Sequence, residues 1–321
     1  MAFKKSELQR AYRTMRVIRE FEDRIHSENS LGNVPGFIHL SAGQEASAVG
    51  VCWNLNREDY ISSTHRGHGH TIAKGCDVRA MMHEIFARAS GLCNGKGGSM
   101  HMADIGMGML GANGIVGAGA PLSCGAALAA RLRGTDNIAV SFFGDGAYNE
   151  GAVLESLNLS KVLNLPIIFV LENNGYGEAT PAEYAVAGDI LKRAEAFGLV
   201  AEETDGHDFF AVEAAARRLI KRAREGKGPA LLHSKLSRYY GHFEGDPATY
   251  RPKGEVDAIK KERDSLMLFR RRVEGDKLLT VAQLDEIDEA VIAEIDGYIV
   301  EAKQAPPPAV ETLYRDAYGS Y

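Results

Sequence analysis

The chain has 321 residues, of which 45% are hydrophobic and 25% charged, and its formal net charge at pH 7 is −6. This composition is ordinary for a globular protein, and the length suffices for one large α/β domain. The acidic balance gives no reason to expect nucleic acid as a partner. The sequence has no run of roughly 18 apolar residues to span a membrane, and its first residues lack the apolar core of a signal peptide. We therefore expect a cytoplasmic protein without membrane attachment.

The chain begins with a predicted long helix. Ser6 and Gln9 resemble a capping box, in which a hydroxyl side chain and a side chain three residues later satisfy the first backbone N–H groups. Apolar residues from Leu8 to Ile25 then recur at helical spacing. We expect this helix to end near Gly32, because glycine favours the backbone conformation that terminates helices.

Three further helices are predicted from caps and apolar spacing. Residues 44–55 form one, and Asp77 caps another that runs to Ala89. Thr280 and Gln283 form a capping box at the start of the last helix, whose apolar side chains follow one face. Such a C-terminal helix can cover the core or pack against a partner.

A glycine-rich segment separates the first helices from the middle of the chain. Eleven of the 35 residues in 91–125 are glycine, and little of the segment is periodic. It is too long for a simple connector, so we expect a functional loop held by a ligand or another subunit. Residues 106–111 match G-x-G-x-x-G, but no strand precedes them and no amphipathic helix follows. A dinucleotide fingerprint is therefore not supported. Pro121 is expected to start a helix of small residues.

The most informative part of the sequence is a strand–helix–strand unit. Residues 138–143 form a short β-branched and aromatic run, 153–162 are apolar at helical spacing, and 166–171 form a second apolar run. Such a unit places two parallel strands side by side with a right-handed crossover. Asp145 and Asn174 follow the two strands, so both should emerge at the carboxyl edge of the sheet, where open α/β folds bind ligands.

The residues at that edge suit a metal-bound diphosphate. One carboxylate (Asp145), one amide oxygen (Asn174) and a nearby carbonyl make a partial oxygen set of the kind that Mg²⁺ completes with phosphate and water. Gly144 and Gly146 allow a diphosphate to approach the backbone amides at the start of the next helix. Each fragment alone is also typical of a turn. Their combination on one edge favours a binding site over two unrelated turns.

The rest of the chain alternates helices and strands, which predicts an α/β fold with a mostly parallel sheet and helices on both faces. We expect a single domain over 1–321, with helical extensions at about 1–35 and 255–321. The predicted elements after the central unit are a helix near 190–197, a strand near 199–203, a basic helix over 208–224 and a strand over 229–234.

Several motifs in order resemble one known family. Gly144-Asp145-Gly146 with Asn173-Asn174 is similar to the thiamine diphosphate motif, and the surrounding sequence resembles the alpha subunits of the 2-oxo acid and acetoin dehydrogenase complexes. The resemblance implies the thiamine-diphosphate-binding fold and thiamine diphosphate with Mg²⁺ as cofactors. The other motifs that carry it are Phe37-Ile38-His39-Leu40, Gly43-Gln44-Glu45-Ala46, Ser63-Thr64-His65-Arg66-Gly67-His68-Gly69, Gly95-Lys96-Gly97-Gly98-Ser99-Met100-His101, Asn113-Gly114-Ile115-Val116-Gly117 and Tyr240-Gly241-His242-Phe243.

The resemblance also assigns roles to individual residues. The carbonyl of Tyr176 would be the third metal ligand beside Asp145 and Asn174. His242 would reach the diphosphate and the reacting centre, and His39 is a second catalytic candidate; a solvated loop histidine is the alternative for His242. The remaining cofactor contacts would be the amides of Gly146 and Ala147 after Gly144, the guanidinium of Arg66 with His65 beside it (a position more often tyrosine in the family), and the backbone of Gly114 and Val116 for the aminopyrimidine ring.

Three histidines, His65, His68 and His70, form an H-x-x-H-x-H pattern that could bind a transition metal. The sequence offers no carboxylate or cysteine beside them, and Arg66 lies between the first two. A cation is therefore disfavoured at this pattern.

The carboxylate that activates thiamine diphosphate is not found near the Asp145–Asn174 unit. In the resembled family a beta subunit supplies this glutamate, so the chain should be active only in an assembly such as α2β2. We expect the alpha subunit of a dehydrogenase that cleaves acetoin and passes a two-carbon unit to the lipoyl group of an acyltransferase partner. Pyruvate or another 2-oxo acid is the alternative substrate. A non-catalytic cofactor-binding chain is a further alternative, which the intact set of site residues disfavours.

Overall fold

The computed structural model describes residues 3–315. Its centre is a six-stranded sheet in the order β2-β1-β3-β4-β8-β7, in which every neighbouring pair is parallel. All six strands therefore end at the same edge. The strands are β1 (Tyr60–Ser62), β2 (Met109–Gly111), β3 (Ala139–Gly144), β4 (Ile167–Asn173), β7 (Val200–Asp205) and β8 (Ala230–Lys235), with β5 (Tyr176–Gly177) and β6 (Thr180–Pro181) in a separate hairpin.

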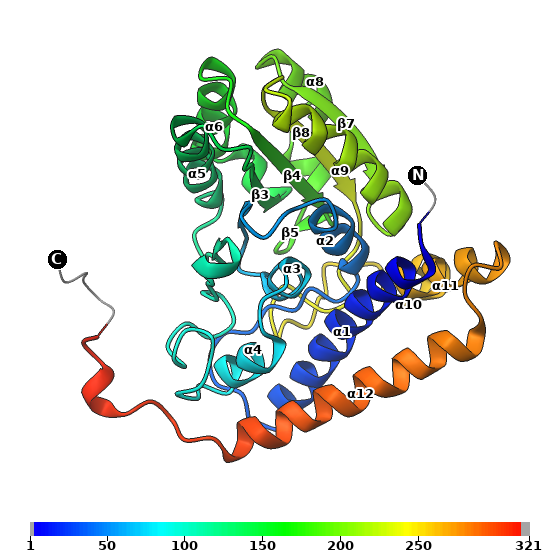
Figure 1. Ribbon diagram of the computed structural model, residues 1–321. Helices are drawn as coiled ribbons and strands as arrows, with labels where there is room; N and C mark the ends of the chain where they lie inside the picture. The colour runs from blue at the N-terminus through cyan, green and yellow to red at the C-terminus, as the bar shows by residue number, and fades with distance from the viewer. Residues whose placement is uncertain (1–2, 316–321) are drawn as a thin grey trace.

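Helices cover both faces of the sheet (Figure 1). On one side α5 and α6 pack together, and on the other α9 packs against the sheet and against α2. The predicted α/β architecture is thus confirmed. The helices are α1 (Lys5–Ser30), α2 (Glu45–Cys52), α3 (His68–Lys74), α4 (Val78–Ile85), α5 (Gly119–Arg133), α6 (Gly151–Val162), α7 (Ala182–Ala185), α8 (Ile190–Ala196), α9 (Phe209–Arg224), α10 (Glu255–Arg263), α11 (Ser265–Gly275) and α12 (Val281–Gln304), with short 3-10 turns η1 (Ile105–Met107), η2 (Gly146–Asn149) and η3 (Val310–Thr312).

The two central strands supply both hydrophobic cores. Along β3, Val140 and Phe142 face the core shared with α1, α2 and α9, whereas Ala139 and Phe143 face the core shared with α5 and α6. This alternation follows from the two-residue period of a strand, and burial on both faces explains why the sequence run is almost wholly apolar.

The long helices α1 and α12 lie side by side along one flank of the molecule (Figure 1). Ion pairs join them, including Arg13 with Glu294 and Arg24 with Asp296. Apolar residues of both helices belong to the same buried core as the sheet. The two helical extensions predicted from the sequence are therefore packed into the sheet domain.

Helix caps and ends differ in part from the predictions. The capping box Thr280–Gln283 is present on α12, as predicted. The predicted cap at Ser6 is wrong, because α1 starts at Lys5 and the Lys4 backbone N–H bonds to the Glu7 carboxylate instead. Helix α4 is capped by Asp77 but ends before Ala89, since Ala87 takes the left-handed conformation.

Several short elements near the site were not predicted, among them β1 and the β5–β6 hairpin. The histidine-rich stretch forms helix α3, and part of the glycine-rich segment forms the edge strand β2. Helix α5 also begins two residues before Pro121, at Gly119. All three lack an extended periodic pattern, so their structure depends on tertiary contacts rather than on local sequence: α3 packs on α1 and α2, β2 pairs with β1, and α5 packs on β3.

A single buried carboxylate holds the first part of the glycine-rich segment. One oxygen of Glu84 accepts the backbone N–H groups of Cys93 and Gly95, and the other accepts those of Gly97 and Gly98, at 2.7–3.0 Å. Charge-assisted bonds of this kind are stronger than neutral ones. The segment that we expected a ligand or subunit to hold is therefore also anchored from within by α4.

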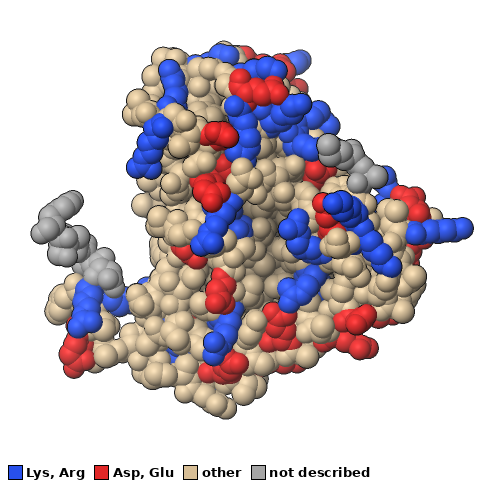
Figure 2. Space-filling view, in the orientation of Figure 1, with Lys and Arg blue, Asp and Glu red and all other residues tan. Residues whose placement is uncertain are grey.

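The surface carries charges of both signs. On the face shown in Figure 2, lysines and arginines are interspersed with acidic residues. Among residues 3–315 there is no helix with the length and apolar character needed to cross a membrane.

Replacing Glu84 by Gln should loosen the glycine-rich segment. The amide would point N–H groups at two backbone donors, so we expect the free energy of unfolding to fall by about 3 kcal/mol. Limited proteolysis between Gly91 and His101 should become faster. The exposed Glu289→Gln on α12 serves as control, and an unchanged cleavage rate in Glu84→Gln would show that the carboxylate does not anchor this segment.

Candidate functional site

A cavity of about 540 Å³ opens at the carboxyl edge of the sheet. Its walls come from the segments that follow β1, β3, β4 and β8, and from the glycine-rich segment. The structure brings all twelve residues predicted for the site into this one cavity. They are His39, His65, Arg66, Gly114, Val116, Gly144, Asp145, Gly146, Ala147, Asn174, Tyr176 and His242.

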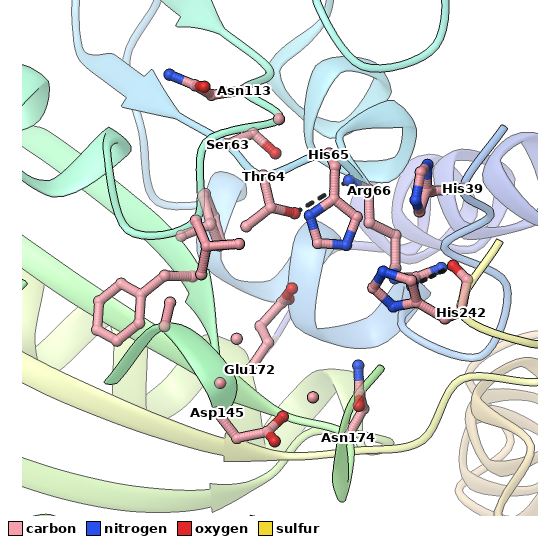
Figure 3. A pocket seen from close by; sticks show the side chains of 18 of the residues that line it. His39, Ser63, Thr64, His65, Arg66, Asn113, Asp145, Glu172, Asn174 and His242 are labelled. Carbon is pink, nitrogen blue, oxygen red and sulfur yellow. Dashed lines mark hydrogen bonds between the residues drawn. The ribbon is translucent and has the colours of Figure 1, made fainter. Parts of the chain in front are cut away.

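The floor of the cavity is formed where β3 and β4 end. These strands pair in register, with Gly144 opposite Glu172, so Asp145 and Asn174 lie close together (Figure 3). Asp145 is 1% exposed, and its Oδ2 has no hydrogen-bond partner among the described residues. Burial raises the pKa of this carboxyl above its usual value. A buried oxygen without a partner is costly, so this geometry fits a cation ligand.

Two glycines, Gly146 and Gly177, form the backbone beside Asp145. A Cβ placed on Gly177 would lie only 3.3 Å from the Cα of Gly146, so the two glycines pass each other tightly. The Tyr176 carbonyl accepts a hydrogen bond from Arg238 at 3.2 Å and retains a second lone pair. The predicted oxygen set of Asp145, Asn174 and Tyr176 therefore has available lone pairs.

Two buried guanidinium groups, those of Arg66 and Arg238, line the cavity. Arg66 donates to the carbonyls of Leu40 and His242, the latter at 2.8 Å. Burial, with Arg238 nearby, lowers the pKa of Arg66 to about 9, so it remains charged at neutral pH. The pair of N–H groups that we expected Arg66 to offer to a diphosphate thus donates to backbone carbonyls. Arg66 therefore contributes its positive charge to the cavity rather than a free pair of N–H donors.

Three histidine rings cluster beside Arg66 (Figure 3). The ring nitrogens of His39, His65 and His242 lie within 4.8 Å of one another. Burial, with the charge of Arg66, lowers their pKa values to about 3, 2 and 4, so all three rings are neutral at pH 7. The same charge disfavours a metal cation among them. His242 is part of the cavity wall rather than a solvated loop residue.

The other two histidines of the predicted H-x-x-H-x-H pattern point elsewhere. His68 contacts Glu22 at 3.1 Å and Ser99 at 2.9 Å, and His70 contacts Glu172 at 3.2 Å. No carboxylate is adjacent to these histidines in the sequence, but folding brings Glu22 to His68 and Glu172 to His70. Since α3 directs the side chains apart, the pattern does not form one metal site.

Among the lining residues that the sequence did not predict for the site are Gln44, Glu172 and Arg238. Glu172 is 5% exposed and its Oε1 has no hydrogen-bond partner in the described part of the chain. A signal existed for two of them, because Glu172 directly ends a buried strand and Arg238 follows another. Gln44 lies far away in sequence, and only the packing of α2 below the sheet edge brings it here.

An open parallel sheet with a polar, glycine-bounded cavity at its carboxyl edge defines a ligand-binding α/β protein. Comparison with known proteins narrows this class. Residues 13–311 match the family model described as dehydrogenase E1 component. The chain therefore belongs to the dehydrogenase E1 component family.

Individual relatives cover almost the whole chain. It is 55% identical to the alpha subunit of acetoin:2,6-dichlorophenolindophenol oxidoreductase of Cupriavidus necator over 318 residues, 99% of this chain and 96% of that protein. The Bacillus subtilis protein of the same name is 50% identical over 97% of this chain and 93% of its own length. The pyruvate dehydrogenase E1 alpha subunit of Rhizobium meliloti is 39% identical over 98% of this chain and 90% of its own.

The neutral histidines predict a dependence of stability on pH. His39 has its pKa lowered to about 3, whereas an unfolded histidine protonates near pH 6.5. Between these values the unfolded chain binds more protons, so stability is lost as the pH falls. We expect His39→Gln to reduce that loss by about 1 kcal/mol per pH unit below pH 6, measured by urea unfolding from pH 7 to pH 5. The exposed His101→Gln is the control. Equal slopes for wild type and His39→Gln would mean that His39 titrates normally.

Proposed function

We propose that this chain is the alpha subunit of a thiamine-diphosphate- and Mg²⁺-dependent dehydrogenase that acts on acetoin. The observation that carries the proposal is the buried Asp145 carboxylate, which has an oxygen without a partner among the described residues and lies beside Asn174 and two glycines. Relatives that are 50–55% identical are named for acetoin, whereas the pyruvate dehydrogenase relative is 39% identical. This difference favours acetoin over pyruvate, which remains the alternative.

The cavity residues divide into groups with different tasks. Asp145, Asn174 and the Tyr176 carbonyl would hold Mg²⁺, because hard oxygen ligands suit it. The amides after Gly144 would meet the diphosphate at the start of η2. The remaining cofactor contacts would be the amides of Gly146 and Ala147 for the phosphates, Arg66 for their charge with the neutral His65 ring beside it, and the backbone of Gly114 and Val116 for the aminopyrimidine ring.

Bound thiamine diphosphate supplies the electron sink that lets a carbon–carbon bond next to a carbonyl break. The protein's share is to position the substrate and handle its protons. His242 has an Nδ1 without a partner among residues 3–315, so it can bond a substrate oxygen directly. His39 and His65 lie beside it as neutral rings. Neutral imidazoles can both donate and accept protons, as the hydroxyl and carbonyl of acetoin require.

A beta subunit would complete the site. The cavity mouth carries exposed apolar side chains, among them Ile115 at 72% and Val116 at 48% exposure, which suit cover by a second chain. The cavity does contain a glutamate, Glu172, which could be taken for the activating one. It lies opposite Gly144 in the sheet, however, so we assign it to the part of the cavity that would hold the metal. We therefore infer an α2β2 enzyme in which the beta subunit supplies the activating glutamate and a lipoyl acyltransferase accepts the product.

Asp145→Ala should abolish Mg²⁺-dependent binding of thiamine diphosphate by the assembled complex. Because burial already disfavours the charged carboxylate, the variant should unfold at the same temperature as wild type or higher. Calorimetric titration with thiamine diphosphate in excess Mg²⁺ measures the affinity, with the exposed Asp257→Ala as control. An unchanged affinity in Asp145→Ala would rule out the metal site.

The chain alone should show no turnover. Coexpression with its beta subunit should restore oxidation of acetoin with 2,6-dichlorophenolindophenol as electron acceptor, at a higher kcat/KM than for pyruvate. Substantial activity of the purified chain by itself would refute the two-subunit site. A preference for pyruvate in the complex would instead select the alternative substrate.

A further inference from the structure

A chain of hydrogen bonds crosses the floor of the cavity. Ser63 contacts Nδ1 of His70 at 2.7 Å, and Nε2 of His70 contacts Oε2 of Glu172 at 3.2 Å. The Gln44 amide nitrogen donates to the same oxygen at 3.4 Å, and the Asn174 amide nitrogen donates to Oε1 of Gln44 at 3.2 Å. All of these side chains except Asn174 are buried.

Glu172 sets the direction of the hydrogen bonds that lead to Asn174. The Gln44 amide nitrogen, and not its oxygen, faces the Glu172 carboxyl and donates to it. Gln44 then has only its oxygen left for the other side. That oxygen faces Asn174, whose NH2 group must therefore turn toward it, which fixes the orientation of the Asn174 amide.

The consequence appears at the opposite end of that amide. Its oxygen, Oδ1, is turned away from Gln44 and accepts the backbone N–H of Tyr176 at 3.3 Å. The oxygen and nitrogen of an asparagine amide are nearly equal in size, so packing alone barely distinguishes the two orientations. Only the hydrogen-bonding direction separates them.

We propose that Gln44 is a positioning residue that presents the oxygen, rather than the nitrogen, of Asn174 to the Mg²⁺ of the proposed function, on which this inference rests. A flipped amide would direct its NH2 group at the cation and lose one oxygen ligand. Gln44 acts through Asn174, and Glu172 holds it in the required orientation.

This role can be separated from simple packing because aspartate has two equivalent carboxylate oxygens. An aspartate at position 174 offers an oxygen to the metal in either orientation and needs no partner to select one. The loss caused by removing Gln44 should therefore depend on which residue occupies position 174. A packing defect would be felt equally in both cases.

The test is a double-mutant cycle on the αβ complex. Mg²⁺ affinity is measured by calorimetry at saturating thiamine diphosphate for wild type, Gln44→Met, Asn174→Asp and the double variant. We expect Gln44→Met to weaken Mg²⁺ binding about 10–100-fold, the usual effect of removing a residue that orients a ligand, and to cause no loss in the Asn174→Asp background. Ser47→Ala, a buried change on the same helix α2, is the control.

A second variant guards against a folding defect in Gln44→Met. Glu172→Met removes the acceptor that orients Gln44 without changing α2, and its loss of Mg²⁺ affinity should be larger with the native Asn174 than in the Asn174→Asp background. Equal losses in both backgrounds, or no loss with Asn174, would overturn the positioning role. A wild-type complex that binds thiamine diphosphate without any divalent cation would overturn the proposed metal site itself, an outcome visible before any variant is made.

Discussion

The pairing of β3 with β4 is the constraint on which the site depends. With Gly144 opposite Glu172, the next residues of the two strands bring Asp145 and Asn174 together at the sheet edge. A slip of one residue would turn Val140 and Phe142 away from their core, so the hydrophobic pattern and the site share one register. The burial that stabilises the sheet thereby also fixes the geometry of the candidate metal ligands.

Burying charge at that edge is costly, and the charged groups themselves indicate what offsets the cost. Asp145 and Glu172 lie at the strand ends, each with one oxygen lacking a partner among the described residues. Arg66 donates to the carbonyls of Leu40 and His242, and Arg238 donates to the carbonyls of Tyr176 and Glu178. Carboxylates and guanidinium groups buried in one cavity match a metal-bound diphosphate, which carries charges of both signs. A bound group of this kind would offset the cost of burying both sets of charges.

The histidines show how one residue type serves different purposes in one site. His39, His65 and His242 are kept neutral by burial and by Arg66, which lower their pKa values, and they face the space where a substrate would lie. His70 instead belongs to the polar floor, where it contacts Glu172 at 3.2 Å. Neutral rings suit an uncharged substrate such as acetoin.

The sequence alone was sufficient for the fold class, the central strand–helix–strand unit and the meeting of Asp145 with Asn174, because apolar strand runs and glycine-flanked polar strand ends are local patterns. The other predicted residues of the cavity were assigned by the resemblance to a known family. The sequence also indicated the family, because the motifs of that family occur in order over almost the whole chain. Only the tertiary structure revealed Gln44 and the bond from His70 to Glu172, as well as the cluster of His39 with His65 and His242. These contacts join segments that are far apart in sequence, and hydrogen-bond direction and pKa depend on which groups pack together in three dimensions.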